Sequence, residues 1–229
     1  MNRIAGVVRM YLRDRLGWFY TPWFILGISF AVNLAIAGIA NVPITTGGLA
    51  SIYIYLLVVG IVSVSQTFPF AIGFSVRRRD YMLGTLSAIG ALSAAFSLLL
   101  VLLAKIEADW IAGWGVDLTF FNLAYLTDGG ALGQWWSHFG FIMHLFMTGF
   151  LFGSIHRKLG RNGIFAVFTA LSVVLTIAGF LINYYERWDD IGRWIENHPS
   201  TAVELSAYLL PLTVAYALIS YMLLRKATV

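Results

Sequence analysis

Long apolar runs, separated by short polar or charged segments, make up most of this chain. A transmembrane helix needs roughly 20 consecutive apolar residues, and an ionised side chain at its centre costs about 2.5–3.5 kcal/mol on insertion scales. Stretches without Asp, Glu, Lys or Arg therefore mark candidate spans. The first such stretch, from Leu16 to Val76, is too long for one span. The turn-forming residues 41–48 divide it into two apolar segments.

Six apolar segments predict six transmembrane helices. The predicted spans cover residues 21–40, 51–74, 84–104, 136–155, 163–184 and 203–224. Residues 2–19 predict an amphipathic helix, since Ile4, Val8 and Leu12 recur at helical spacing while arginines occupy other faces. Such a helix lies in the membrane interface, with its guanidinium groups among the lipid headgroups. We therefore expect an all-α membrane protein with a single transmembrane domain over residues 1–229.

The composition is that of a protein surrounded by lipid. Of the 229 residues, 59% are hydrophobic and 11% are charged, whereas a soluble domain carries about 25% charged residues. A surface covered by water would need more charged side chains than the chain offers. The absence of cysteine excludes disulfides, thiolate metal sites and cysteine nucleophiles.

The basic residues are concentrated in alternate connections between the predicted spans. Twelve of the fifteen Lys and Arg residues lie at the two chain ends and in the connections between spans two and three and between spans four and five. Nine of the eleven acidic residues lie on the opposite side, eight in the other connections and Glu204 at the start of span six. Because cytoplasmic loops are rich in Lys and Arg, we expect both chain ends in the cytoplasm. This distribution also explains the net charge of +4, so we expect no nucleic-acid partner.

The two main connections on the opposite side are long and aromatic. Residues 105–135 contain the large aromatic residues Trp110, Trp114, Phe120, Phe121, Tyr125 and Trp135. A solvated loop rarely holds so many, so we expect this loop to lie on or dip into the outer interface of the bilayer, where it could form a lid. Residues 185–202 predict a short amphipathic helix on the outer surface. A role in the aromatic belt alone is the simpler interpretation of both segments.

Two common motifs of soluble enzymes are missing from the sequence. It contains no Gly-x-x-x-x-Gly-Lys-Ser/Thr phosphate-binding loop and no Gly-x-Ser-x-Gly nucleophile motif. Ser29 faintly resembles the serine of rhomboid-type intramembrane proteases, but it lies in the wrong span, and serine in a membrane helix usually bonds its own backbone. His138, His144 and His156 are not spaced to bracket one metal ion or haem. We therefore predict no catalytic residue and no metal site.

The predicted spans contain polar residues but no charged residue well inside the membrane. Ion-coupled transporters usually carry charged side chains at membrane depth, so transport against a gradient would need energy from a partner. A passive channel or facilitator is the alternative. The candidates for a substrate path are the uncharged residues Asn33, Gln66, His144, Thr169 and Thr176. Pro69 and Pro211 lie inside spans and are hinge candidates, because proline removes a helix hydrogen bond.

Two basic segments carry a resemblance to a known family. Residues 70–85 (FAIGFSVRRRDYMLGT), which include a predicted cytoplasmic coupling segment at 75–84, join spans two and three. Residues 153–160 (GSIHRKLG) join spans four and five. Both resemble the cytoplasmic loops of the integral-membrane permease subunits of bacterial ATP-binding-cassette exporters, of the type-two (type V fold) class. The layout of six spans with an interfacial N-terminal helix is similar to that family over nearly the whole chain.

The resemblance implies a half-transporter in the bacterial cytoplasmic membrane. Two such permeases would pair, as a homodimer or a heterodimer, and bind separate ATPase subunits that hold ATP and magnesium. The chain itself would not be an enzyme. The resemblance implies ATPase docking by Arg77, Arg78, Arg79, Asp80 and Tyr81, and a second contact by His156, Arg157, Lys158 and Arg161. Topology alone is the alternative explanation of the arginine cluster, since basic residues on the cytoplasmic side need no partner.

Overall fold

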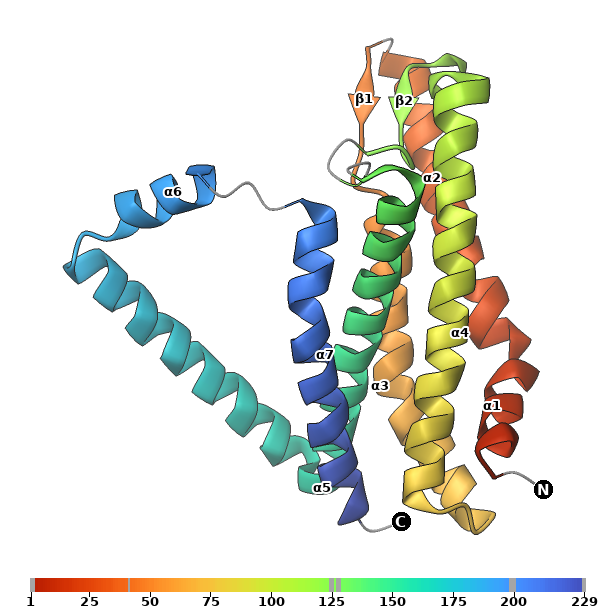
Figure 1. The fold of residues 1–229 in the computed structure, drawn as a ribbon, viewed down its shortest axis with the longest axis vertical. Coiled ribbons are helices and arrows are strands. Elements are labelled where there is room, and N and C mark those ends of the chain that lie inside the picture. Colours follow the sequence, from red (N-terminus) through yellow and green to blue (C-terminus); the bar gives the residue numbers. More distant parts are fainter. Residues whose placement is uncertain (1–2, 41, 124–125, 127–128, 198–200, 228–229) are drawn as a thin grey trace.

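A computed structural model describes residues 3–40, 42–123, 126, 129–197 and 201–227 (Figure 1). The described chain is almost entirely helical, and five of its helices are long and apolar enough to cross a membrane. The predicted all-α class is therefore confirmed, and the chain has the build of a multi-pass membrane protein. The first and last described residues lie at the same end of the molecule (Figure 1), which we call the terminal end.

The N-terminal segment forms two helices instead of the single helix predicted over 2–19. Helix α1 (Arg3–Arg13) ends before Asp14, and a π-helical turn η1 (Leu16–Tyr20) leads into α2 (Thr21–Ala40). The Asp14 carboxylate accepts a hydrogen bond from the Gly17 N–H at 3.1 Å, which offers the backbone an alternative to the helical pattern. The apolar face of α1 packs on α4 (Arg78–Lys105), so α1 is part of the folded bundle.

The bundle core is formed where α3 (Ala50–Gly73) packs along the first part of α5 (Gly130–Tyr184). Two glycines allow this close approach. A Cβ atom at Gly149 would overlap the Leu57 carbonyl oxygen, and one at Gly60 would overlap the Phe146 carbonyl oxygen. Membrane helices associate through such close packing, because the hydrophobic effect contributes little when apolar side chains leave lipid for another helix.

Helix α5 is divided into two arms at Gly160. This residue has φ 68° and ψ −165°, a backbone region that is essentially restricted to glycine. The first arm, 130–159, packs between α3 and α7 (Ala202–Arg225). The second arm, 161–184, diverges from the bundle, and α6 (Trp188–Asn197) connects its far end towards α7 (Figure 1). Side chains along the second arm are exposed almost throughout.

The end of the bundle opposite the termini is closed by the aromatic connection. It folds through η2 (Ile106–Ile111), η3 (Gly113–Gly115) and a short strand β2 (Leu118–Thr119), which pairs in parallel with β1 (Ile44–Thr45). Phe120 is fully buried, and Phe121 nearly so. These two rings of the connection are therefore packed into the bundle end as part of the core, whereas Trp110 is 82% exposed. Tyr125 lies outside the described residues.

Candidate functional site

The turn between α3 and α4 presents an aromatic and basic surface at the terminal end. Phe70 and Phe74 are 55% and 71% exposed, and their rings contact each other with centroids 4.7 Å apart. Arg77 precedes α4 and Arg79 lies in its first turn; both are exposed, and their side chains form no hydrogen bond or ion pair with the described residues. Exposed aromatic and arginine side chains are the residue types that anchor protein interfaces. We call these four residues the turn surface.

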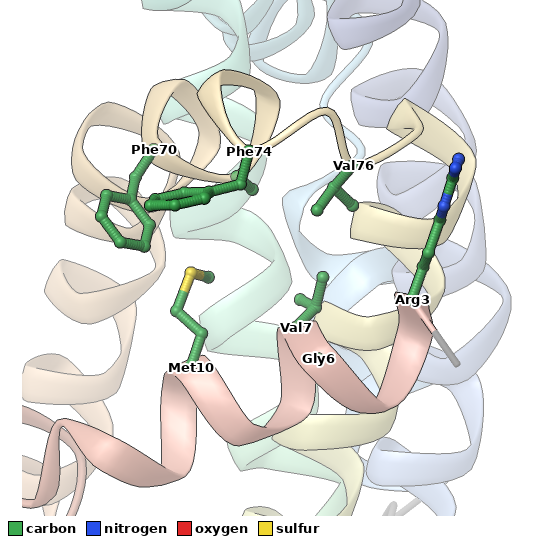
Figure 2. A pocket seen from close by; sticks show the side chains of 8 residues that line it. Arg3, Gly6, Val7, Met10, Phe70, Phe74 and Val76 are labelled. Atoms are coloured by element: carbon green, nitrogen blue, oxygen red, sulfur yellow. The ribbon is translucent and has the colours of Figure 1, made fainter. Parts of the chain in front are cut away.

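A cavity of about 450 Å³ separates the turn surface from α1. Figure 2 shows Val7 and Met10 of α1 on one side of it, and Phe70, Phe74 and Val76 on the other. Its walls are apolar, and the guanidinium of Arg3 lies at its edge. The volume falls within the range of about 300–1,000 Å³ that is usual for ligand pockets.

Arg78 points in a different direction from its two neighbours. Its guanidinium donates hydrogen bonds to the backbone carbonyls of Arg225 and, at 2.8 Å, of Ala227. Lys158, from the second basic segment, donates to the Lys226 carbonyl at 3.0 Å. Carbonyls at the end of a helix lack intrahelical partners, and these cations satisfy them. Both basic segments therefore hold the end of α7.

The other residues of the second basic segment differ in environment. His156 and Arg161 are exposed, whereas Arg157 is half-buried. The Arg157 guanidinium carbon lies 6.0 Å from the centre of the Phe68 ring, at the limit of a cation–π contact. Asp80, also half-buried, lies in the first turn of α4, where a negative charge interacts favourably with the helix dipole.

Beneath the turn surface, four hydroxyl groups form a hydrogen-bonded cluster that joins three helices. Tyr81 is completely buried; its hydroxyl is 2.8 Å from that of Thr67 and accepts a hydrogen bond from Tyr11 at 3.2 Å. The Tyr11 hydroxyl is also 3.0 Å from both Thr67 and Thr85. Burial raises the pKa of Tyr11, which keeps this hydroxyl protonated. We call Tyr11, Thr67, Tyr81 and Thr85 the hydroxyl cluster; it links α1, α3 and the start of α4.

The candidates for a substrate path are distributed over separate helices, and no hydrogen bond joins any two of them among the described residues. Asn33 on α2 donates to the Ser29 carbonyl and accepts from the Thr46 hydroxyl, both at 2.8 Å. Asn33 therefore fixes the loop at the end opposite the termini. Gln66 on α3 is exposed, and with Asp14 it lines a cavity of about 300 Å³ beside η1.

His144 lies on the first arm of α5 and contacts α7. Its Nδ1 is 2.9 Å from the Thr213 hydroxyl, and its ring centre is 5.5 Å from that of Tyr216. The Thr213 hydroxyl donates its hydrogen to the Leu209 carbonyl at 2.8 Å. The contact between His144 and Thr213 joins α5 to α7.

The last two path candidates lie on the second arm of α5. Thr169 and Thr176 are exposed, and the Thr176 hydroxyl donates to the Ser172 carbonyl at 2.8 Å. Residues at three- and four-residue spacing share a helix face, so these three polar residues form one stripe on an otherwise apolar arm. The hinge candidates Pro69 and Pro211 lie inside α3 and α7, and both helices continue past them.

Glu107 is a buried carboxylate that the sequence reasoning did not single out. It is 3% exposed, and it accepts hydrogen bonds from the backbone N–H groups of Phe120, Phe121 and Asn122 and from the Trp114 indole at 2.7 Å. These donors offset the cost of burying the charge. The signal in the sequence was an acid directly after an apolar span, followed by an aromatic connection.

The chain was compared with known families, proteins and structures. No family model matches the sequence, and neither a curated protein nor a solved structure matches the chain. The functional assignment therefore depends on the residues and the geometry of this chain.

Proposed function

We propose that the chain is the permease subunit of an ATP-binding-cassette exporter, forms half of a translocation pathway, and is coupled to separate ATPase subunits. The observation that carries this proposal is the turn surface, in which two exposed phenylalanines and two arginines without side-chain partners among the described residues lie in the segment between Thr67 and Tyr81, two members of the hydroxyl cluster. A protein that bound the turn surface would be connected at once to α1, α3 and α4.

The topology of the proposal is six crossings with both ends in the cytoplasm. The two arms of α5 on either side of Gly160 count as two crossings, and α2, α3, α4 and α7 supply the other four. The turn surface and the second basic segment then lie on the same side as both chain ends. Lys105, Arg187 and Arg193 would lie on the other side, and the resulting excess of Lys and Arg on the cytoplasmic side agrees with the positive-inside rule.

The ATPase partner would bind mainly through Phe70, Phe74, Arg77 and Arg79, with His156 and Arg161 as a second exposed contact. Aromatic and arginine side chains of this kind supply most of the energy of protein interfaces, and the free arginines favour an acidic groove on the partner. ATP and magnesium would be held by that partner, since the chain lacks a phosphate-binding loop.

Coupling would follow the buried connections. Within this proposal Tyr81 transmits movement through the hydroxyl cluster, and Asp80 stabilises the start of α4. Arg78 and Lys158 would carry the same movement to the end of α7. ATP-driven closure of the two ATPase subunits would then rock these helices as rigid bodies between two access states.

The second permease subunit, identical or different, would pack against the second arm of α5. Apolar side chains there, such as Phe165, Leu175 and Phe180, are more than 60% exposed. Lipid can cover part of this arm. Its stripe of Thr169, Ser172 and Thr176 would face the path between the two subunits.

The proposal is tested by purifying the chain from its native membranes in a mild detergent. We expect an ATP-hydrolysing subunit to co-purify. Double replacement Arg77→Glu and Arg79→Glu should reduce its recovery at least tenfold, whereas the control Arg13→Glu, on the exposed end of α1, should retain it. Absence of any ATPase from the wild-type preparation, together with solute flux into liposomes without ATP, would instead identify a channel or facilitator.

A further inference from the structure

A second large cavity, of about 610 Å³, lies between the α1–η1 segment and α4. On the α4 side its wall contains Ala91 and Ala95, which are one turn apart and both exposed. On the other side the wall contains Leu12, Phe19 and Tyr20, all three largely exposed. The cavity is therefore a smooth apolar groove with an aromatic rim. Small residues often bring helices together, but here they leave room for something other than a side chain of this chain.

The edge of this groove carries one arginine whose side chain has no partner among the described residues. Arg15 lines the cavity, is exposed, and has no hydrogen bond or ion pair with the described residues. The neighbouring acid, Asp14, also lines the cavity, but its carboxylate caps the Gly17 N–H at 3.1 Å. An anion at the edge of the groove could therefore pair with Arg15.

We infer that this groove binds an anionic phospholipid, with one acyl chain along Ala91 and Ala95 and the headgroup phosphate at Arg15. An amphipathic helix lies at the boundary between the lipid headgroups and the acyl chains. An apolar groove at the end of such a helix can therefore contact both parts of one lipid. Water would be poorly bound there, because it needs polar partners. The inference requires only that α1 lies at the membrane interface, and it does not depend on the export proposal.

A helix from a second copy of the chain fits the groove less well. The α4 residues that line the groove lie between Ala88 and Phe96, whereas a membrane helix needs a contact surface along most of its span. The site is therefore expected to hold a flexible acyl chain. The bound lipid would hold α1 against α4, beside the hydroxyl cluster.

The test measures lipid association with the purified full chain in nanodiscs. Phosphatidylglycerol and phosphatidylcholine, each spin-labelled on the acyl chain, are compared by electron paramagnetic resonance. We expect phosphatidylglycerol to associate about fivefold more strongly at one site, as one nearby cation predicts. Arg15→Gln should remove this preference, whereas Arg13→Gln, on the preceding turn and outside the cavity, should retain it.

A second pair of variants tests the groove itself. Ala91→Leu with Ala95→Leu fills the groove and should abolish the preference for phosphatidylglycerol. Gly90→Leu is the control, since a Cβ atom added at Gly90 meets nothing within 4 Å, and it should leave the preference unchanged. Lipid association that is the same in Arg15→Gln and Arg13→Gln would overturn the inference. So would a groove-filling variant that changed the oligomeric state, measured by light scattering, and left lipid association intact.

Discussion

The guanidinium of Arg78 and the backbone carbonyl of Ala227 lie 2.8 Å apart, so that the start of α4 is tied to the end of the chain. Arg78 also donates to the Arg225 carbonyl. The neighbouring Arg77 and Arg79 have no such partners among the described residues. Three consecutive arginines therefore have two different roles: one stabilises the fold, and two are available to a partner.

Arg78→Gln should destabilise the protein, because it removes hydrogen bonds to two carbonyls that no helix partner satisfies. The expected loss is about 1 kcal/mol for this partly exposed group, which lowers the melting temperature by roughly 2–4 °C in a chain of this size. Arg79→Gln should leave the melting temperature unchanged and weaken ATPase binding. Thermal unfolding in detergent compares the two, and equal melting temperatures would contradict the division of roles.

Tyr81→Phe should weaken the connection between α4 and the two helices that it contacts through the hydroxyl cluster. The substitution removes the hydroxyl that contacts both Tyr11 and Thr67, and it should lower the free energy of unfolding by about 1 kcal/mol. We expect normal ATPase binding with less solute transported per ATP hydrolysed. Tyr216→Phe is the control, because its hydroxyl has no hydrogen bond to the described residues. Unchanged coupling in Tyr81→Phe would exclude a transmitting role for the cluster.

Glu107→Gln should loosen the aromatic connection at the end opposite the termini. A glutamine places an NH₂ group against one or more of the backbone N–H donors, and the lost charged hydrogen bonds are worth about 2 kcal/mol or more. Hydrogen exchange of the amides of Phe120, Phe121 and Asn122 should become faster. Asp109→Asn is the control: Asp109 is exposed on the same helix and bonds none of these amides. Unchanged exchange in Glu107→Gln would show that other contacts hold the connection.

Gly149→Ala should disrupt the packing of α3 on α5, because its Cβ would overlap the Leu57 carbonyl oxygen. The Leu57 carbonyl belongs to the helix backbone and cannot move aside as a flexible side chain can. The free energy of unfolding should therefore fall by about 1–3 kcal/mol, or the variant should fail to fold. Gly179→Ala lies on the second arm of α5 and meets nothing within 4 Å. It should behave as wild type in expression and thermal unfolding. Equal stability of the two variants would contradict the packing described.

The sequence was most informative where one physical effect dominates. The cost of a charge in lipid locates the apolar runs, and α2 occupies the predicted 21–40. The same effect places a connection between the apolar runs of α5, because Arg157, Lys158 and Arg161 interrupt them. The structure divides this helix at Gly160, within that basic segment.

The sequence was least informative about contacts between residues far apart along the chain. No local pattern pairs Arg78 with Ala227, or Tyr11 with Tyr81, because these partners are brought together only by helix packing. Asp14 illustrates the same limit at short range: its spacing fits the amphipathic helix, but its side chain caps Gly17 and ends α1 instead. The candidates for a substrate path were chosen because they are polar. Polarity alone does not determine which helix faces pack together.

The most direct test of ATPase coupling places a photo-crosslinking amino acid at Phe74, in cells that express the full chain at its native level. The proposal predicts a covalent adduct with an ATP-hydrolysing subunit, which is lost when Arg77→Glu and Arg79→Glu are added. The same crosslinker at Phe180, on the second arm of α5, should give no ATPase adduct. A turn surface that crosslinks only to lipid or to a second copy of the chain, in membranes that transport the solute, would contradict the proposal.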